Sequence, residues 1–239
     1  MTEYFGQEYQ RAQRTWEQIL PECSMNTIFI TPLWQSVWWK RFTPSGKLII
    51  EVVDEGEFDL GVITLHINEG IASFIGDSNL YDYMDFPVVA GKEELFFTKA
   101  LKKISQLDWQ TLKLESIFED SPTLEFISDK SRALGMDVEI KESDKTPLVL
   151  LPDTWDEYLL QLRKKDRHEL RRKFRRLDAN GDSEQIEVNV DSENVDTVMD
   201  QFFDLMALSG EDKSIFLETD KRGFFKDIAS SLSDSGQYR

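Results

Sequence analysis

The amino-acid sequence predicts an α+β protein with a mixed, mostly antiparallel sheet flanked by helices. Three extended runs follow one another at residues 47–53, 59–67 and 71–75. The stretch Asn68-Glu69-Gly70 between the last two is typical of a hairpin turn, which makes neighbouring strands antiparallel. Amphipathic helical patterns precede and follow these runs, and a chain of 239 residues with 40% hydrophobic residues is long enough to bury a sizeable core.

Two helices are expected before the first strand. The earlier one covers about residues 8–20, where apolar side chains recur at three- and four-residue spacing, and Pro21 ends it. Thr31 suits the N-cap of the next helix and Pro32 its first position, so an aromatic helix is expected to run to Phe42. Two tryptophans of this helix share a face by their spacing, and such a face is more often part of a core than a ligand-binding wall.

Extended and helical patterns alternate after the three strands. Apolar residues recur at i, i+3, i+4 and i+7 in the next helix, and Ser121-Pro122 and Gly135 mark the two ends of another. The expected elements are a fourth extended segment within 81–89, a helix at 92–107, a strand at 109–117, a helix from Pro122 to Gly135, and extended runs at 136–140 and 147–151.

The last third of the sequence predicts mainly helices. Thr154 and Glu157 form a capping box that opens a helix expected over 155–177. The apolar positions of this helix recur at i, i+4 and i+7 and are expected to pack against the protein body: Leu170, Phe174 and Leu177. A strand at 186–190 and helices at about 195–206 and 219–233 are expected to follow.

Charge is distributed unevenly along the chain. The formal net charge is −17, which argues against a protein whose whole surface binds nucleic acid or an anionic membrane. Residues 163–177 nevertheless carry nine Lys/Arg against two acidic residues. This segment suits an anion-binding site, because guanidinium groups bind phosphate and carboxylate well. A solvated helix balanced by the acidic flanks explains the same pattern and is the favoured interpretation.

Motifs of known chemistry are scarce. His66 and His168 lie far apart with no second ligand at metal-binding spacing, so no metal site is expected and both are interpreted as structural or surface residues. Cys23 is the only cysteine; it excludes an intrachain disulfide, suits a reducing compartment and is expected to be inert. No signal peptide and no apolar run long enough for a membrane span are present, which predicts a cytoplasmic protein.

Asp82, Tyr83 and Asp85 form an acidic and aromatic cluster. Two carboxylates and a phenol can bind an amine or polyol, and one carboxylate with a raised pKa can act as a general base. In an extended segment Asp82 and Asp85 point to opposite faces, so a joint role requires a turn. Capping of a loop is an equally good interpretation.

Several short stretches, in this order, resemble the CelD-type acetyltransferases. They are Phe29-Ile30-Thr31-Pro32-Leu33-Trp34 with Trp38-Trp39, Asp82-Tyr83-Met84-Asp85, Asp120-Ser121-Pro122-Thr123-Leu124, Leu150-Leu151-Pro152, and Arg167-His168-Glu169-Leu170-Arg171-Arg172-Lys173. This family is similar to the FemAB proteins, which have tandem GNAT-like domains, and its name links it to cellulose or exopolysaccharide biosynthesis. The resemblance covers nearly the whole chain, and the arginine-rich block is its most specific part.

The resemblance implies a domain organisation. A first GNAT-like half is expected over residues 1–152, a basic connecting helix over 153–180, and the start of an incomplete second GNAT-like half over 181–239. In such tandem proteins the acyl donor binds in the second half, where a glycine-containing loop holds the pyrophosphate. No such loop is found in this sequence, so the donor-binding residues stay unassigned and this chain alone is expected to bind acetyl-CoA poorly.

The resemblance also implies a function. The protein is expected to be an N- or O-acyltransferase that moves an acyl group from CoA to a sugar or cell-envelope precursor. Acetyl-CoA or another acyl-CoA is the co-substrate, a small molecule or glycan is the acceptor, and no permanently bound cofactor, specific nucleic acid or membrane span is expected. The alternative is a non-catalytic module that binds a polyanion through the basic helix. The expected site residues are Asp85 as the catalytic carboxylate, Asp82 and Tyr83 for the acceptor, and Arg167, Arg171 and Arg172 for anionic groups.

Overall fold

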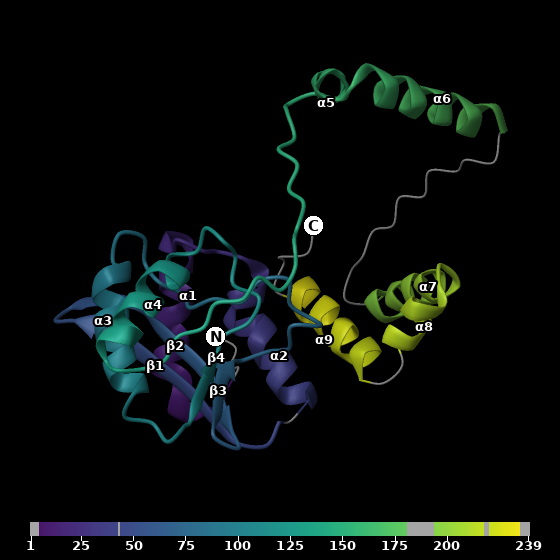
Figure 1. Ribbon diagram of the computed structural model, residues 1–239. Coiled ribbons are helices and arrows are strands. Elements are labelled where there is room, and N and C mark those ends of the chain that lie inside the picture. The colour runs from purple at the N-terminus through teal and green to yellow at the C-terminus, as the bar shows by residue number, and fades with distance from the viewer. Residues whose placement is uncertain (1–4, 43, 181–193, 218–219, 235–239) are drawn as a thin grey trace. The chain divides into compact units, whose positions relative to one another are not determined.

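The computed structural model describes residues 5–42, 44–180, 194–217 and 220–234. The chain divides into two compact units, and each is described by itself. The first comprises residues 1–141 and 190–239, and the second comprises residues 142–189. The predicted α+β class is confirmed, because the first unit combines a mixed sheet with helices that cover it (Figure 1). Within the described residues, no helix is long and apolar enough to cross a membrane.

The sheet has the strand order β1-β2-β3-β4. Strands β1 (Lys47–Glu55), β2 (Phe58–Asn68) and β3 (Ile71–Phe74) are antiparallel, as predicted, and β4 (Thr111–Lys113) runs parallel to β3. Glu69 and Gly70 have φ angles of 48° and 76°, the two positive values that a tight two-residue hairpin requires. Of the strand predicted at 109–117, only the three residues of β4 pair with a neighbour.

Helices cover both faces of this sheet. The first short turn η1 (Gln7–Tyr9) leads into α1 (Gln10–Ile19), which packs on β1 and β2, as does α3 (Glu93–Ile104). Eight successive residues of β2 are buried, which requires cover on both sides. The remaining elements before residue 141 are η2 (Leu20–Glu22), η3 (Ile28–Ile30), α2 (Pro32–Phe42) and α4 (Pro122–Ala133).

The expected helix ends of α2 and α4 are confirmed. The Thr31 hydroxyl accepts a hydrogen bond from the Trp34 backbone N–H at 3.3 Å. Ser121 caps α4 in the same way, and Gly135 after its end has a φ of 79°. Trp34 and Trp38 are buried, so their predicted place in the core is confirmed.

The segment 81–89 does not form a regular strand, contrary to expectation. Val88 makes an isolated bridge to Gly61, and Val89 makes one to Cys23. Pro87 has no N–H and interrupts a continuous ladder. Gly61 permits the segment around Pro87 to approach β2 closely, because a Cβ at this position would lie 2.6 Å from the Pro87 carbonyl oxygen.

The runs 136–140 and 147–151 were also expected to be extended strands, and no strand forms at either. A strand needs a neighbour to accept and donate its backbone hydrogen bonds, and neither run has one among the described residues. Leu148, Val149, Leu150 and Leu151 are instead exposed.

Three C-terminal helices belong to the first unit: α7 (Val195–Leu208), α8 (Glu211–Phe216) and α9 (Lys221–Asp234). Phe224 of α9 is fully buried, with its ring 5.7 Å from both the Trp34 and the Phe42 ring centroids. Arg41 Nε donates to an Asp227 carboxylate oxygen at 2.9 Å. Helix α9 therefore completes the core around α2 (Figure 1). The separate second half expected over 181–239 stays a prediction, and the strand expected at 186–190 lies outside the described residues.

The second unit contains α5 (Trp155–Gln161) and α6 (Lys164–Asn180). The capping box of Thr154 and Glu157 is confirmed. The single helix expected over 155–177 is wrong, because Leu162 has extended backbone angles (φ −72°, ψ 146°) and separates α5 from α6. Phe174 is 47% exposed and Leu177 is 50% exposed, so their expected burial is also wrong. The Phe174 ring packs edge-on to Trp155 at 5.9 Å instead.

Candidate functional site

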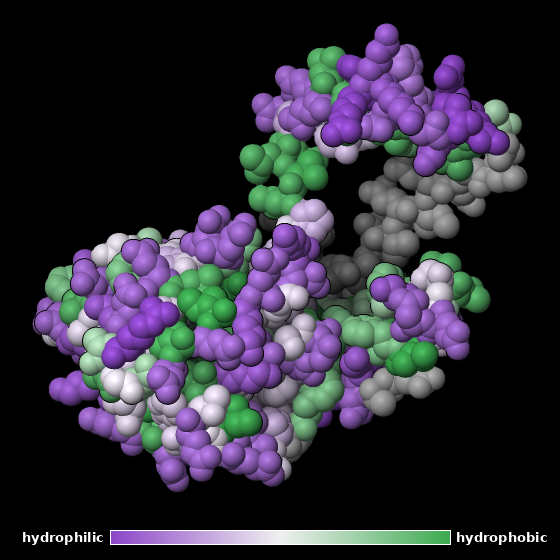
Figure 2. Space-filling model, viewed as in Figure 1, coloured by the Kyte–Doolittle hydropathy of each residue, from purple (hydrophilic) through white to green (hydrophobic). Residues whose placement is uncertain are grey.

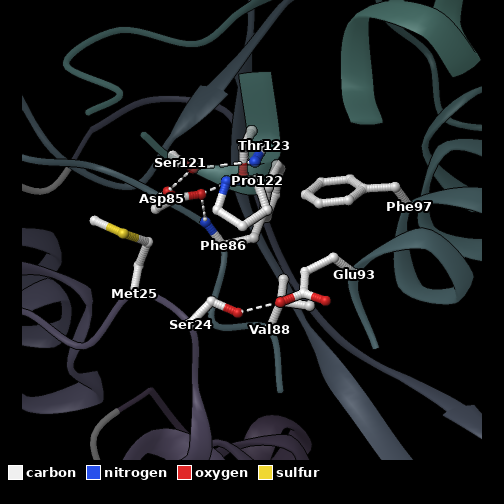
Figure 3. A pocket seen from close by; sticks show the side chains of 10 residues that line it. All are labelled: Ser24, Met25, Asp85, Phe86, Val88, Glu93, Phe97, Ser121, Pro122 and Thr123. Carbon is white, nitrogen blue, oxygen red and sulfur yellow. Dashed lines mark hydrogen bonds between the residues drawn. The ribbon is translucent and has the colours of Figure 1, made fainter. Parts of the chain in front are cut away.

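A small polar hollow in the first unit contains one predicted site residue. Its volume is about 10 Å³, which is room for about one water molecule. Asp85 lies in its wall, together with side chains from the loop before α2, from α3 and from the start of α4 (Figure 3). The other lining residues are Ser24, Met25, Phe86, Val88, Glu93, Phe97, Ser121, Pro122 and Thr123.

The Asp85 side chain is hydrogen-bonded to residues at the start of α4. Asp85 is 3% exposed, and its carboxylate accepts hydrogen bonds from the Ser121 and Thr123 hydroxyls and, at 2.8 Å, from the Phe86 backbone N–H. The Ser121 hydroxyl oxygen in turn accepts from the Thr123 N–H at 3.0 Å. Burial raises the pKa of Asp85 above its usual value, an effect that outweighs the opposing effect of the three donors.

Sequence reasoning missed two further features of this hollow. Ser121 and Thr123 were noted for the helix start and the family motif, but their contact with Asp85 joins residues 36 and 38 positions apart. The Ser24 hydroxyl donates to the Glu93 carboxylate, 69 positions away in the chain. A Ser-Pro-Thr stretch predicts the cap, but it does not identify a distant carboxylate as the partner.

The structure separates Asp82 and Tyr83 from Asp85. Asp82 is exposed and Tyr83 is half-buried, and neither lines the hollow. The Tyr83 ring lies between Phe29, at 6.5 Å, and Phe118, at 5.5 Å between centroids. One carboxylate is therefore exposed to solvent and the other is buried, so the two do not form a joint site.

The three predicted arginines lie in α6, in the other unit. Arg167 is half-buried, whereas Arg171 and Arg172 are exposed. Arg172 makes a bidentate ion pair with Glu169, in which the Nε–Oε2 distance is 3.0 Å and the Nη2–Oε1 distance is 2.6 Å. This hydrogen bonding holds the pKa of Glu169 below its usual value. Among the described residues, Arg172 is thus the one of the three arginines that has an acidic partner to neutralise part of its charge.

Two remaining candidates, His66 and Cys23, have the environments of structural residues. His66 is buried in β2, with Nε2 2.5 Å from the Ser45 carbonyl oxygen and its ring edge-on to Trp39, which confirms a structural histidine. Burial raises the pKa of Cys23 to about 12, so its thiol stays protonated at neutral pH, as expected of an inert cysteine. No group of three or more potential metal ligands is found in the described part of the chain.

The first residue of α6 is also where a similarity to known proteins begins. Residues 164–239 match the acetyltransferase (GNAT) domain family. No curated protein and no solved structure matches the chain. The family match supports a GNAT-like fold, and it includes α6, α7, α8 and α9. The basic helix therefore belongs to the matched region.

Proposed function

We propose that this protein is a GNAT-type acyltransferase that moves an acyl group from CoA to an amine or hydroxyl of a sugar or cell-envelope precursor. The observation that carries the proposal is the family match over residues 164–239. Acyl transfer is the general activity that such a domain suggests. The sugar or envelope acceptor rests on the finer resemblance to CelD-type proteins.

Asp85 is the proposed catalytic carboxylate. Attack of the acceptor nitrogen or oxygen on the thioester carbonyl forms the new C–N or C–O bond, breaks the C–S bond and releases CoA as the thiol. The acceptor loses one proton, which passes through a water in the hollow to the Asp85 carboxylate and from there to the CoA thiolate, so that CoA leaves as the thiol. The raised pKa of Asp85 supports this role, because a more basic carboxylate accepts a proton more readily.

Asp82 and Tyr83 are the proposed acceptor contacts. An exposed carboxylate and a half-buried phenol can hold the hydroxyls or amine of a sugar. Arg167, Arg171 and Arg172 are the proposed contacts to anionic groups of donor or acceptor. Because Arg172 is paired with Glu169, we expect Arg167 and Arg171 to contribute more.

The proposal is tested with the full chain, millimolar acetyl-CoA and a panel of amino sugars and polyols, with acetylated product detected by mass spectrometry. We expect Asp85→Asn to lower product formation more than Asp82→Asn at equal amounts of folded protein, since only Asp85 lines the hollow. Absence of product with every acceptor from a folded chain would contradict acyl transfer by this protein. Equal activity of both variants and the wild type would show that neither carboxylate takes part in the reaction.

A second candidate function, a non-catalytic polyanion-binding module, is favoured by one observation. Arg172 is the one Lys or Arg of α6 that makes an ion pair with another described residue. The other Lys and Arg side chains of α6, which make no ion pair with a described residue, are available to a polyanion. Strong retention on heparin that falls steeply with salt, together with no detectable binding of acyl-CoA, would favour this module over the transferase.

A further inference from the structure

We propose that residues 147–177 of the second unit form a surface that binds anionic lipid bilayers peripherally. The inference is independent of acyl transfer and rests on this unit alone. It combines two features of the unit: apolar side chains that lie in water, and a helix rich in positive charge.

The apolar feature begins in the segment that precedes α5. The four consecutive side chains from Leu148 to Leu151 are 59–79% exposed, and Trp155 is 53% exposed. Leu160, Phe174 and Leu177 are also exposed. Figure 2 shows the hydrophobic residues of the extended segment that leads into α5. Burying such side chains away from water is favourable in proportion to their area, so a surface of this kind favours an apolar partner.

The charged feature lies in α6. This helix carries eight Lys/Arg and three acidic residues, and most of its visible surface is hydrophilic (Figure 2). Leu170, Phe174 and Leu177 recur at i, i+4 and i+7 and so form one narrow stripe. A strongly charged helix with an aromatic and aliphatic stripe is typical of helices that lie in the plane of a membrane interface. Contact between the Phe174 and Trp155 rings joins α5 to that stripe.

A bilayer surface accommodates both features at once. Anionic headgroups attract each nearby Lys or Arg, while the boundary of the acyl chains takes up Leu, Phe and Trp side chains. A soluble polyanion would neutralise the arginines and leave the apolar run in water. The chain as a whole has a charge of −17, so association depends on the local basic helix and is expected to weaken as salt screens it.

The test uses the full chain and sedimentation with vesicles of phosphatidylglycerol and phosphatidylcholine. We expect binding to mixed vesicles, at least tenfold weaker binding to phosphatidylcholine alone, and loss of binding as salt rises. Brominated lipids should quench the fluorescence of Trp155, an effect that disappears in Trp155→Phe. The other five tryptophans lie in the first unit, where Trp16, Trp34 and Trp38 are buried and Trp39 and Trp109 are partly buried, and their signal is the background that remains in Trp155→Phe.

Two double variants separate the contributions. Arg175→Glu with Arg176→Glu and Leu150→Ser with Phe174→Ser should each reduce binding by about tenfold or more, because each removes one of the two attractions. Arg132→Glu in α4 and Leu208→Ser in α7 alter an exposed arginine and an exposed leucine elsewhere, and we expect both to bind as the wild type does. Circular dichroism verifies the helical content of each variant.

Three results would overturn the proposal: no binding to mixed vesicles, equal binding to both kinds of vesicle, or undiminished binding of the Leu150→Ser and Phe174→Ser variant. The last result would show a simple polyanion-binding helix. Because acyl transfer is measured without vesicles, its loss and the loss of membrane binding are distinguishable.

Discussion

Asp85 is the residue whose substitution should affect the first unit most directly. In Asp85→Ala two hydroxyls and one backbone N–H lose their acceptor in a buried place, which we expect to lower the free energy of unfolding by about 3 kcal/mol. Asp85→Asn keeps the shape and one acceptor oxygen, so a smaller loss is expected. Urea denaturation of the three proteins measures both. An alanine variant as stable as the wild type would show that the cluster contributes nothing to the fold.

The pH dependence of stability follows from the same residue. Burial raises the pKa of Asp85 in the folded protein, so the folded state binds this proton more tightly than the unfolded state does. The resulting stabilisation is fully present below the unfolded pKa and is lost as pH rises through the folded pKa. We therefore expect the wild type to gain stability relative to Asp85→Asn on acidification from neutral pH. A difference between the two that does not change with pH would contradict the raised pKa.

In helices α5 and α6, the expected loss of stability on substitution differs from what the sequence predicts. A buried Phe174 would cost about 3 kcal/mol or more on replacement by Ala, but a half-exposed ring against Trp155 should cost about 1 kcal/mol. Thr154→Ala removes the capping box and should cost a similar amount. Arg176→Ala, an exposed change in the same helix, is the control. Thermal unfolding followed by circular dichroism measures all three, and a Phe174→Ala loss as large as that of a core phenylalanine would mean that the ring is buried.

Local patterns explain which elements could be predicted. The hairpin at 68–70, the caps at Thr31 and Ser121 and the capping box at Thr154 each depend on residues within a few positions of one another. The missing strand at 147–151 depends on a distant neighbour, which no local pattern contains. The break at Leu162 follows no glycine or proline, so periodicity alone joined α5 to α6. In the hollow, Asp85 was predicted as a candidate, whereas its hydroxyl partners lie too far along the chain to be assigned from sequence.

At the scale of the whole molecule, the core of the first unit depends on α9. Phe224→Ala removes a fully buried ring that packs on Trp34 and Phe42, and we expect a loss of about 3–5 kcal/mol in the free energy of unfolding. Leu208→Ala in α7, at a leucine that is 84% exposed, should change it by less than about 1 kcal/mol. Denaturation monitored by tryptophan fluorescence distinguishes them. Equal effects of the two variants would show that α9 does not stabilise this core.

Donor binding is a second property of the whole chain. The sequence has no Gly-x-Gly turn to hold a pyrophosphate, so we expect calorimetry with acetyl-CoA to detect only weak binding, which is why the activity test uses millimolar acetyl-CoA. The hollow beside Asp85, with its volume of about 10 Å³, is too small to hold the donor itself. Saturable micromolar binding would contradict this expectation and would place a donor site in residues that sequence reasoning did not consider.

The position of α9 in the core has a consequence for synthesis on the ribosome. Roughly 90 residues separate the end of α4 at Ala133 from Phe224, and at about 5–20 residues per second their translation takes roughly 5–20 s. During this interval the emerging sheet and α2 lack the ring that later covers Trp34 and Phe42. The nascent chain must therefore carry an uncovered aromatic surface for seconds, a window in which a chaperone or premature self-association competes with completion of the core.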